Sequence, residues 1–545
     1  MNLAKQYDVI IIGGGATGAG TARDCASRGL KVLLVERKDF ATGATGRNHG
    51  LLHSGARYAV TDEESATECI KENRILRKIA RHCVEETEGL FITLPEDDLA
   101  YQATFVESCL KAGISAEVIS PEEARRMEPA VNPDLIGAVK VPDGAVDPFR
   151  LVSANLLDAR LKGAEVLTYH EVTGFIRTQN RIEGVELRNT LSGETVKAYA
   201  PVTVNAAGIW GHLVAAMAGV DIAMFPAKGS LLVFGHRVNN MVINRCRKPA
   251  NADILVPGDT ICLIGTTSDR IPFEDIDKNE VSAADVDLLL SEGAKLAPAL
   301  YSTRILRAYS GVRPLVAADN DPSGRSISRG IVCLDHATRD GLEGFVTITG
   351  GKLMTYRLMA EWVTDMVCRK LGRTALCTTA TTPLPGSAEK IDVDSRRGRK
   401  EFISLRMGEK GAEGRHGDRR SQMEFRESGD AALVCECEQV SVAEVRYAIE
   451  SLGATNLVDL RRRTRLGMGT CQGHICALRG ADLLGKKVGS EEALRDVASF
   501  VDERWRGVRP VAWGESLVEA QFTQWFYEGV CGLGQIVERE AEEKI

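Results

Sequence analysis

The first 35 residues combine apolar runs and a glycine turn in a pattern typical of a strand–helix–strand unit. Residues 7–12 and 31–35 are rich in large apolar side chains, and the glycines at 13–15 precede a helix-compatible stretch at 16–28. Strands that are apolar on both faces are covered on both sides, as the strands of a parallel sheet are. We therefore predict a parallel βαβ unit at the start of the chain.

Two further stretches show clear periodicity. Between 66 and 81 charged residues fall on one side of a helical projection and apolar residues on the other, which predicts an amphipathic surface helix. From 202 to about 345 short β-rich segments dominate, and we expect them to build a substrate domain on an antiparallel sheet. The segments are 230–234, 253–256, 260–265 and 344–349.

The composition changes after residue 382. Residues 383–430 are rich in Gly, Arg, Lys, Glu and Ser and poor in large apolar side chains, which predicts a linker. Residues 431–485 contain four closely placed cysteines and predict a small compact domain. Residues 486–545 look helical and aromatic, and hold three of the five tryptophans.

Length and charge exclude several classes of protein. A chain of 545 residues suits about three structural units. The net charge of −7 argues against a surface built for nucleic acid. We expect no signal segment and no apolar run near the roughly 18 residues that span a bilayer, so any membrane contact is peripheral or made through a partner. The fourteen cysteines are expected to be reduced thiols and metal ligands.

The glycine turn carries a dinucleotide-binding motif. The string Gly13-Gly14-Gly15-Ala16-Thr17-Gly18 matches G-x-G-x-x-G between a predicted strand and helix. Gly13 permits the tight turn, Gly15 lets a pyrophosphate approach the backbone, and Gly18 lets helix and strand pack closely. Glu36 ends the second strand, where a carboxylate can bind ribose hydroxyls. A ligand-free tight turn is the weaker interpretation.

Later glycine-rich strings favour FAD over NAD. The loop from Thr42 to Gly46 can admit a long cofactor, and the strings 205–210 and 350–355 each follow a predicted strand. The second of them could present backbone N–H groups to a flavin. The predicted FAD-binding residues are Gly13, Gly14, Gly15, Thr17, Gly18, Glu36, Arg37, Thr42, Thr45, Ala207, Gly208, Gly350, Gly351, Lys352, Leu353, Met354 and Thr355.

Four cysteines form two close pairs. Cys435 and Cys437 are separated by one residue, and Cys471 and Cys476 by four. Four thiolates so placed can ligate a [2Fe-2S] cluster. Zinc is the main alternative, although its knuckles usually show paired C-x-x-C spacing, and four unligated thiols are a third. The basic segment 461–465 lies between the pairs and could raise the cluster potential, or could be a solvated surface.

The chain resembles the FAD-dependent glycerol-3-phosphate dehydrogenases, within the D-amino-acid-oxidase-like flavoproteins. The similar strings are His53-Ser54-Gly55-Ala56-Arg57-Tyr58, Lys228-Gly229-Ser230, Ile264-Gly265-Thr266-Thr267, Ser310-Gly311-Val312-Arg313-Pro314-Leu315 and Gly350-Gly351-Lys352-Leu353. With the cysteine domain, which resembles the ferredoxin-like domain associated with bacterioferritin, the similarity extends to the large subunits of the anaerobic type. It implies an α/β fold: a Rossmann-like FAD-binding part interleaved with an antiparallel-sheet substrate part in 1–382, a helical [2Fe-2S] domain, and a helical C-terminal extension.

The resemblance also implies the substrate residues. Arg57, Tyr58, Arg313 and Lys352 would line a pocket for sn-glycerol 3-phosphate, with the guanidinium groups on the phosphate and Lys352 stabilising the alkoxide during oxidation to dihydroxyacetone phosphate. Aerobic relatives carry a histidine where this chain has Leu231, so the general base is open. His53, with His49 behind it, is a candidate, and a structural role beside the flavin is equally weighted. Arg57 and Arg313 could instead pair with carboxylates.

The resemblance further implies partners and location. The partners are a second flavoprotein subunit, together with a membrane-anchored iron–sulfur subunit that passes electrons to quinone. The chain itself would be cytoplasmic and attached peripherally to the inner face of the membrane. The aromatic C-terminal residues suit docking to these partners, but ordinary core packing is preferred. A flavin amine or opine dehydrogenase and an electron-carrier module with an idle flavin remain alternative functions.

Overall fold

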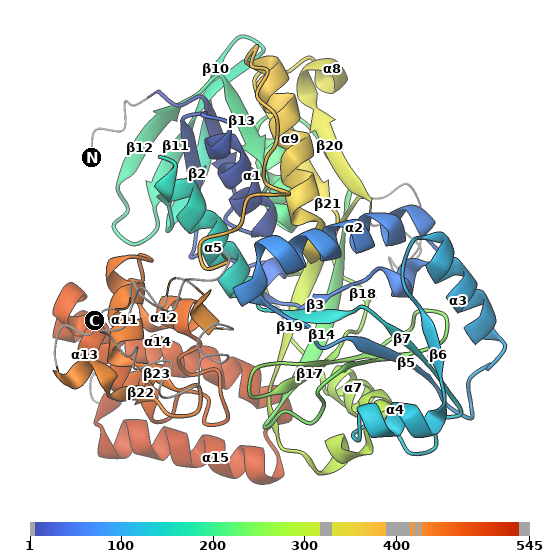
Figure 1. Cartoon of the computed structure of the whole chain (residues 1–545). Helices are drawn as coiled ribbons and strands as arrows, with labels where there is room; N and C mark the ends of the chain where they lie inside the picture. Colours follow the sequence, from blue (N-terminus) through green and yellow to red (C-terminus); the bar gives the residue numbers. More distant parts are fainter. Residues whose placement is uncertain are drawn as a thin grey trace, which may run out of the picture.

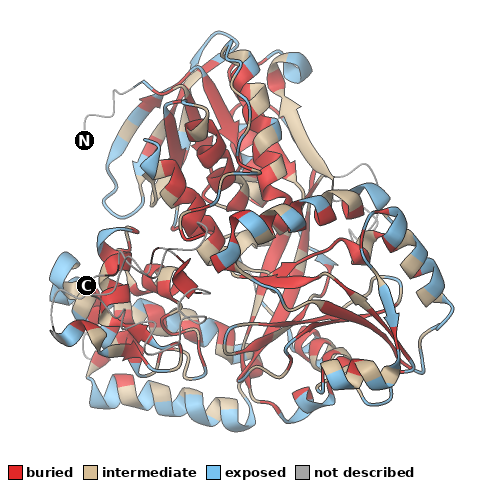
Figure 2. Cartoon of the chain, viewed as in Figure 1, coloured by how far each residue is buried: buried red, intermediate tan, exposed pale blue. Residues whose placement is uncertain are grey.

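Two large sheets and a helical C-terminal domain make up the molecule (Figure 1). The structure is a computed structural model, and it describes residues 6–278, 280–316, 330–387, 415–417, 419, 423 and 428–533. The buried side chains concentrate in the two sheets and the helices packed on them (Figure 2). The predicted α/β class is confirmed.

The first sheet has six strands in the order β20-β21-β13-β1-β2-β9, parallel except for β20. Helix α1 packs between α5 and α9 on one face, and the three-stranded sheet β10-β11-β12 covers the other. The predicted βαβ unit is β1-α1-β2. The bounds are β1 Val9–Ile12, α1 Ala16–Ser27, β2 Val32–Val35, α5 Pro148–Leu161, β9 Glu165–Leu167, β10 His170–Thr178, β11 Arg181–Asn189, β12 Thr195–Tyr199, β13 Val202–Asn205, β20 Ile331–Asp335, β21 Phe345–Gly350 and α9 Tyr356–Lys370.

The second sheet is mostly antiparallel and carries the predicted substrate part. Its order is β18-β14-β17-β16-β15-β5-β7-β6, with β19 paired to β14. The bounds are β5 Gly89–Thr93, β6 Glu117–Ile119, β7 Gly137–Val141, β14 Met224–Phe234, β15 Val242–Arg245, β16 Ile254–Pro257, β17 Cys262–Gly265, β18 Asp269–Arg270 and β19 Ile305–Val316. One expectation was wrong: β21, predicted at 344–349 for this sheet, pairs in parallel with β13 of the first sheet. Periodicity cannot tell which sheet a buried strand joins.

Further helices pack against the two large sheets. The predicted amphipathic helix at 66–81 is α2, and it begins three residues earlier because the Asp62 carboxylate caps it by accepting from Ser65 N. The bounds are α2 Glu63–Ile79, α3 Tyr101–Lys111, α4 Pro121–Met127, α6 Gly211–Met217, α7 Ala283–Leu296 and α8 His336–Asp340. A small sheet of β3 Leu51–Leu52, β8 Gly144–Val146 and β4 Val84–Glu85 links the two large ones.

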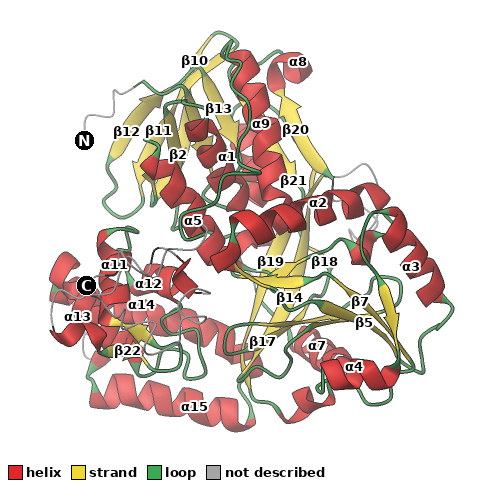
Figure 3. Ribbon diagram, in the orientation of Figure 1, coloured by secondary structure: helices red, strands yellow, loops and turns green. Residues whose placement is uncertain are grey.

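The C-terminal domain is mainly helical and has its own apolar core (Figure 3). The hairpin β22-β23 carries the first cysteine pair, and α13 begins at the last cysteine. The bounds are β22 Leu433–Cys435, β23 Val440–Ser441, α11 Val442–Glu450, α12 Leu457–Thr464, α13 Cys476–Val488, α14 Ser490–Val508 and α15 Gly514–Trp525.

Arginines of α12 attach this domain to the first sheet. Arg463 binds both oxygens of buried Asp39 at 2.8 Å, and Arg462 approaches the same carboxylate at 3.1 Å. Arg465 reaches Glu438 at 2.9 Å and Asp147 at 3.2 Å. The interpretation of this basic segment as a solvated surface was therefore wrong, because its charges are paired between and within domains.

The C-terminal aromatic residues are largely exposed. Trp513, Phe522 and Trp525 have exposed fractions of 49%, 52% and 61%, and α15 has no buried residue. Only Tyr527 of this group is fully buried, and its hydroxyl donates to His474 O at 2.6 Å. Core packing, the preferred expectation for these residues, was wrong for the tryptophans.

Most of the predicted linker lies outside the described residues. Its described part includes buried side chains: Arg415 donates to Thr464 O at 2.7 Å, and His416 contacts Glu444 at 2.6 Å. Burial lowers the pKa of His416 to about 4. At least this part of 383–430 packs on the cysteine domain.

Candidate functional site

The glycine turn after β1 opens onto the N-terminus of α1. A Cβ at Gly13 would lie 2.5 Å from Ala206 O, and one at Gly18 would lie 1.9 Å from Gly13 O, so neither position accepts a side chain. The helix begins after Gly15, which has no side chain to cap it. Its N-terminal partial charge is thus presented to the turn, as a pyrophosphate requires.

Glu36 lies beside this turn. Its carboxylate accepts from Gly14 N at 2.7 Å and from Lys38 N at 2.9 Å. Burial raises the pKa of Glu36, and these two backbone hydrogen bonds oppose the rise. The carboxylate is fixed at the end of β2, where ribose hydroxyls would be bound.

The neighbouring predicted residues have distinct surroundings. Thr45 Oγ1 accepts from Ala16 N at 3.1 Å, and so connects the 42–46 loop to α1. Thr17 Oγ1 contacts Met359 Sδ at 3.7 Å. The Arg37 guanidinium lies 4.6 Å from the centre of the Trp210 ring, and Trp210 is two residues after Gly208. Thr42 lines a cavity between domains.

The second glycine turn joins β21 to α9. Gly350 and Gly351 have φ values of +78° and +64°, which favour glycine. Lys352 N donates to Thr355 Oγ1 at 2.9 Å, and a short 3₁₀ turn at Leu353–Thr355 leads into the helix. Met354, although predicted to bind cofactor, is 1% exposed and contacts Cys69 in the core.

Arg57 lies in a 3₁₀ turn, Ala56–Tyr58, beside the second sheet. Its Nη2 donates to Ala250 O at 3.0 Å and to Asp253 Oδ2 at 3.1 Å. Its Nη1 is buried and has no hydrogen-bond partner among the described residues. Buried donors are normally satisfied, so this nitrogen indicates a place for an acceptor from a ligand.

Arg313 projects from β19 toward an adjacent turn. It donates to Thr266 Oγ1, to Thr267 O at 3.0 Å and to Ser268 Oγ at 3.3 Å. The turns that hold Arg57 and Arg313 are themselves joined, because Ala252 N donates to Thr266 O at 3.2 Å. The two arginines, 256 residues apart in the sequence, thus contact two turns that are joined to each other.

The remaining predicted catalytic residues form a second group around Tyr58. The Lys352 Nζ lies 4.7 Å from the centre of the Tyr58 ring, and the His53 ring centre lies 5.4 Å from it. His49 follows at 6.3 Å from His53. Leu231, at the position of the missing histidine, is fully buried. Because Tyr58 directly follows Arg57, one short turn contributes to both groups.

The four predicted metal-binding cysteines converge in the C-terminal domain. Cys471 lies within hydrogen-bonding reach of Cys437 and Cys476, and Cys476 within reach of Cys435. The hydrogen bond from Cys476 lowers the pKa of Cys435 to about 7. Backbone N–H groups of Gly467 and Glu438 point to Cys435, and those of Ile475 and Gly473 point to Cys471. Such donors stabilise thiolates.

Comparisons with known proteins agree with this geometry. Residues 8–357 match the FAD dependent oxidoreductase family, and residues 433–486 match the BFD-like [2Fe-2S] binding domain. The chain is 65% identical over 533 residues to a subunit of the anaerobic glycerol-3-phosphate dehydrogenase of Escherichia coli (strain K12), covering 97% of this chain and 98% of that protein. The chain belongs to the family of anaerobic glycerol-3-phosphate dehydrogenase A subunits.

More distant members show how far the likeness extends. The protein of the same name from Haemophilus influenzae is 61% identical, covering 97% of this chain and 94% of the relative, and a similarly named protein of Haloferax volcanii is 42% identical, covering 94% and 89%. The solved glycerol-3-phosphate dehydrogenase of Bacillus halodurans, complexed with FAD, has a TM-score of 0.69 at 22% identity, covers 94% of this chain and 97% of its own, and supports the fold.

Both cofactors expected of the anaerobic dehydrogenase family fit these residues. The two glycine turns and Glu36 suit FAD, and the four thiols with their N–H donors suit a [2Fe-2S] cluster. Within the described residues, no helix is both long and apolar enough to cross a membrane.

Sequence reasoning missed two carboxylates that support this site. Asp253, fully buried, accepts from Arg57, from Arg247 at 2.7 Å and from Ala250 N at 2.6 Å. Asp39 holds the cysteine domain. An Asp beside a strand has no sequence signature for such a role. The only signal for Asp39 is its position three residues after Glu36.

Proposed function

We propose that this chain oxidises sn-glycerol 3-phosphate to dihydroxyacetone phosphate and passes the electrons on through its [2Fe-2S] domain. The observation that supports it most directly is the pair Arg57 and Arg313, with a buried Arg57 Nη1 left without a partner among the described residues. The 65% identity to a protein named for this activity supports the same substrate.

The arginines would bind the phosphate group. Arg57 is held by Asp253 through Nη2, so its Nη1 can donate to a phosphate oxygen, and Arg313 adds a second guanidinium from β19. A dianionic phosphate would supply the acceptor that Arg57 Nη1 lacks. Arg57 does pair with a carboxylate, that of Asp253, as the alternative interpretation of this arginine expected. The pairing uses Nη2 and leaves Nη1 available for a phosphate oxygen.

The group around Tyr58 would act at the substrate carbon. Lys352 can stabilise the alkoxide that forms as the C2 hydroxyl loses its proton, and His53 can accept that proton. FAD, when bound, supplies the acceptor for the hydride from C2, and the cluster supplies one-electron transfer. Tyr58 would fix the relative positions of the two side chains through its ring contacts.

The proposal also includes the partner subunits of this chain. The relatives are named as one component of a larger enzyme, which implies further subunits. We infer a second flavoprotein subunit, together with a membrane-anchored iron–sulfur subunit that leads to quinone. This chain would be cytoplasmic and attached to the inner membrane face through a partner. The exposed tryptophans of the C-terminal region support docking there.

Anaerobic reduction tests the proposal. Purified protein with both cofactors, mixed with sn-glycerol 3-phosphate without oxygen, should lose flavin absorbance and then show the electron paramagnetic resonance signal of a reduced [2Fe-2S] cluster. Amino acids and opines serve as controls. Bleaching by these compounds and not by the phosphate ester would contradict it.

A further inference from the structure

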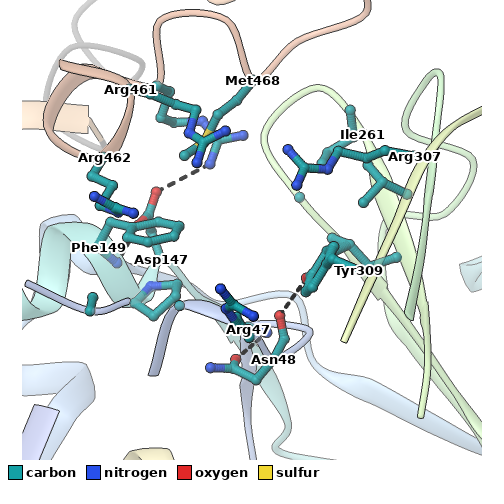
Figure 4. A pocket seen from close by; sticks show the side chains of 18 of the residues that line it. Arg47, Asn48, Asp147, Phe149, Ile261, Arg307, Tyr309, Arg461, Arg462 and Met468 are labelled. Carbon is teal, nitrogen blue, oxygen red and sulfur yellow. Dashed lines mark hydrogen bonds and ion pairs between the residues drawn. The ribbon is translucent and has the colours of Figure 1, made fainter. Parts of the chain in front are cut away.

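A cavity of about 1310 Å³ separates the flavin domain from the cysteine domain. Figure 4 shows its walls: Arg461 and Met468 come from the cysteine domain, Arg47 from the loop after the predicted cofactor strand, and Arg307 and Tyr309 from β19, with open space between them. Arg57, Arg313 and Lys352 do not line it. The cavity therefore does not include these three residues of the proposed substrate pocket, although Arg37 and Thr42 of the predicted cofactor site and His49 beside the candidate base line it.

The cavity is strongly positive. Twelve arginines and two lysines line it, against seven aspartates and glutamates, whereas the whole chain has a net charge of −7. Concave sites lined by one sign of charge concentrate small ions of the opposite sign. The local excess of cations thus has the sign that attracts an anion.

The excess is sharpest around Glu503 on α14. Arg461 Nη1 lies 2.6 Å from Glu503 Oε2, and Arg307 Nη2 lies 3.5 Å from Oε1. Arg504 donates to Gln472 Oε1 at 3.0 Å and to Gly467 O at 2.5 Å. The Arg461 and Arg307 guanidinium groups therefore contact one carboxylate, and the positive charge of the adjacent Arg504 adds to theirs.

Arg47 extends this arrangement from the flavin side. It donates a hydrogen bond to Ser310 O at 3.4 Å, a carbonyl that carries no charge. Burial lowers the pKa of Arg47 and of Arg504, and neighbouring arginines add to the effect, with Arg307 acting on both. Crowded guanidinium groups of this kind are stabilised by a further anion.

We propose that this cavity is a second anion site, which binds a small dianionic oxyanion such as a phosphate group between Arg47, Arg307 and Arg461. Arg47 and Arg307 offer planar guanidinium groups from two different parts of the chain as donors to such an anion, and Arg461, whose two terminal nitrogens contact Glu503, adds positive charge. Cys437, one of the predicted cluster ligands, also lines the cavity. An anion here offsets positive charge beside the cluster and lowers its reduction potential.

The test uses the protein loaded with FAD and cluster, with inorganic phosphate as the probe. Binding is measured by calorimetry and by the thermal midpoint, against chloride at equal ionic strength. We expect a phosphate site that persists in Arg57→Gln, because that variant removes the substrate pocket only. The cluster potential, followed by electron paramagnetic resonance, should fall when phosphate is added.

Two substitutions of opposite sign identify the site. Arg307→Gln should weaken phosphate binding about tenfold, since a charged hydrogen bond contributes roughly 1.5–3 kcal/mol. Glu503→Gln should strengthen it several-fold, because the arginines around it hold the pKa of Glu503 well below its ordinary value, against the effect of burial, and the competing carboxylate is ionised. A mere loss of structure would not tighten binding. Arg495→Gln, at an exposed ion pair outside the cavity, is the matched control.

Several results would overturn the proposal. They are loss of the phosphate effect in Arg57→Gln alone, equal stabilisation by chloride, weaker binding in Glu503→Gln, or binding only when FAD has been removed. The first would place phosphate in the substrate pocket and the last in the pyrophosphate subsite. Each leaves the proposed dehydrogenase activity intact, so the two proposals fail separately.

Discussion

Arg57 and Arg463 are both buried arginines paired with a buried aspartate, yet their surroundings suit them to different roles. All three side-chain nitrogens of Arg463 are engaged, two with Asp39 and the third with Leu452 O at 2.9 Å. Arg57 uses only Nη2, on Asp253 and Ala250, and Nη1 has no partner within the described chain. The number of donors left over, more than the presence of a carboxylate, separates a binding arginine from a structural one.

The largest effect should come from Arg57→Gln. We expect kcat/KM for sn-glycerol 3-phosphate to fall by about 10²–10⁴-fold, because a charged donor to a buried phosphate contributes roughly 3–5 kcal/mol when its removal leaves the other charge unpaired. Steady-state kinetics with an artificial electron acceptor measures this. Arg57→Lys, which keeps the charge but not the fork, should recover only part of the loss. Unchanged kcat/KM would remove Arg57 from the binding role.

The next prediction removes the charged partner of the structural arginine Arg463. Asp39→Asn leaves Arg462 and Arg463 buried without their charged partner, and should lower the free energy of unfolding by about 3–5 kcal/mol. Chemical denaturation measures it, with Asp365→Asn, whose side chain is 45% exposed, as a milder control. The KM for substrate should stay within about twofold, unlike in the Arg57 variant. A large KM effect with no loss of stability would reverse the comparison.

Asp253→Asn tests how the binding arginine is positioned. The amide keeps an acceptor for Arg57 but loses the charge that Arg57 and Arg247 share. We expect KM to rise about tenfold with a smaller change in kcat, since roughly 1.4 kcal/mol of binding depends on the orientation of Arg57. A stable variant with unchanged KM would show that Arg57 does not need this partner.

The smallest effect concerns pH and the attachment of α12. Asp496 accepts from Leu457 N at the start of α12, and burial raises its pKa to about 6. An acid with a raised folded-state pKa favours the folded state most when protonated, so stability falls as pH rises from about 4 to 6. Asp496→Asn should make the stability less dependent on pH across that range, measured by thermal unfolding. An unaltered slope would assign it to other groups.

The sequence predicted local chemistry better than long-range assembly. The glycine turn at 13–18, Glu36 and the four cysteines carry spacing signals set by close backbone contacts, and the structure and comparisons support the cofactors they indicate. The sheet membership of β21 could not be read, because a buried strand has the same pattern in either sheet. Met354 was predicted to bind cofactor from its place in a motif, but its side chain turns into the core.

The sequence alone also could not predict which charges pair across the domains. The segment 461–465 looked like either a cluster-tuning or a solvated feature, and the partner Asp39 lies more than 400 residues away. The exposed aromatics of α15 show the reverse difficulty. Aromatic density suggests burial, but only the packed structure shows which rings the core accepts. The roles of His53 and Lys352 remain predictions.

One loop contacts both the predicted flavin site and the cysteine domain. Glu36 and Asp39 are three residues apart: the first is predicted to bind the ribose, and the second binds the arginines of α12. A displacement of residues 36–40 therefore reaches both centres at once. Binding of the flavin should therefore rigidify the segment on which the cysteine domain packs.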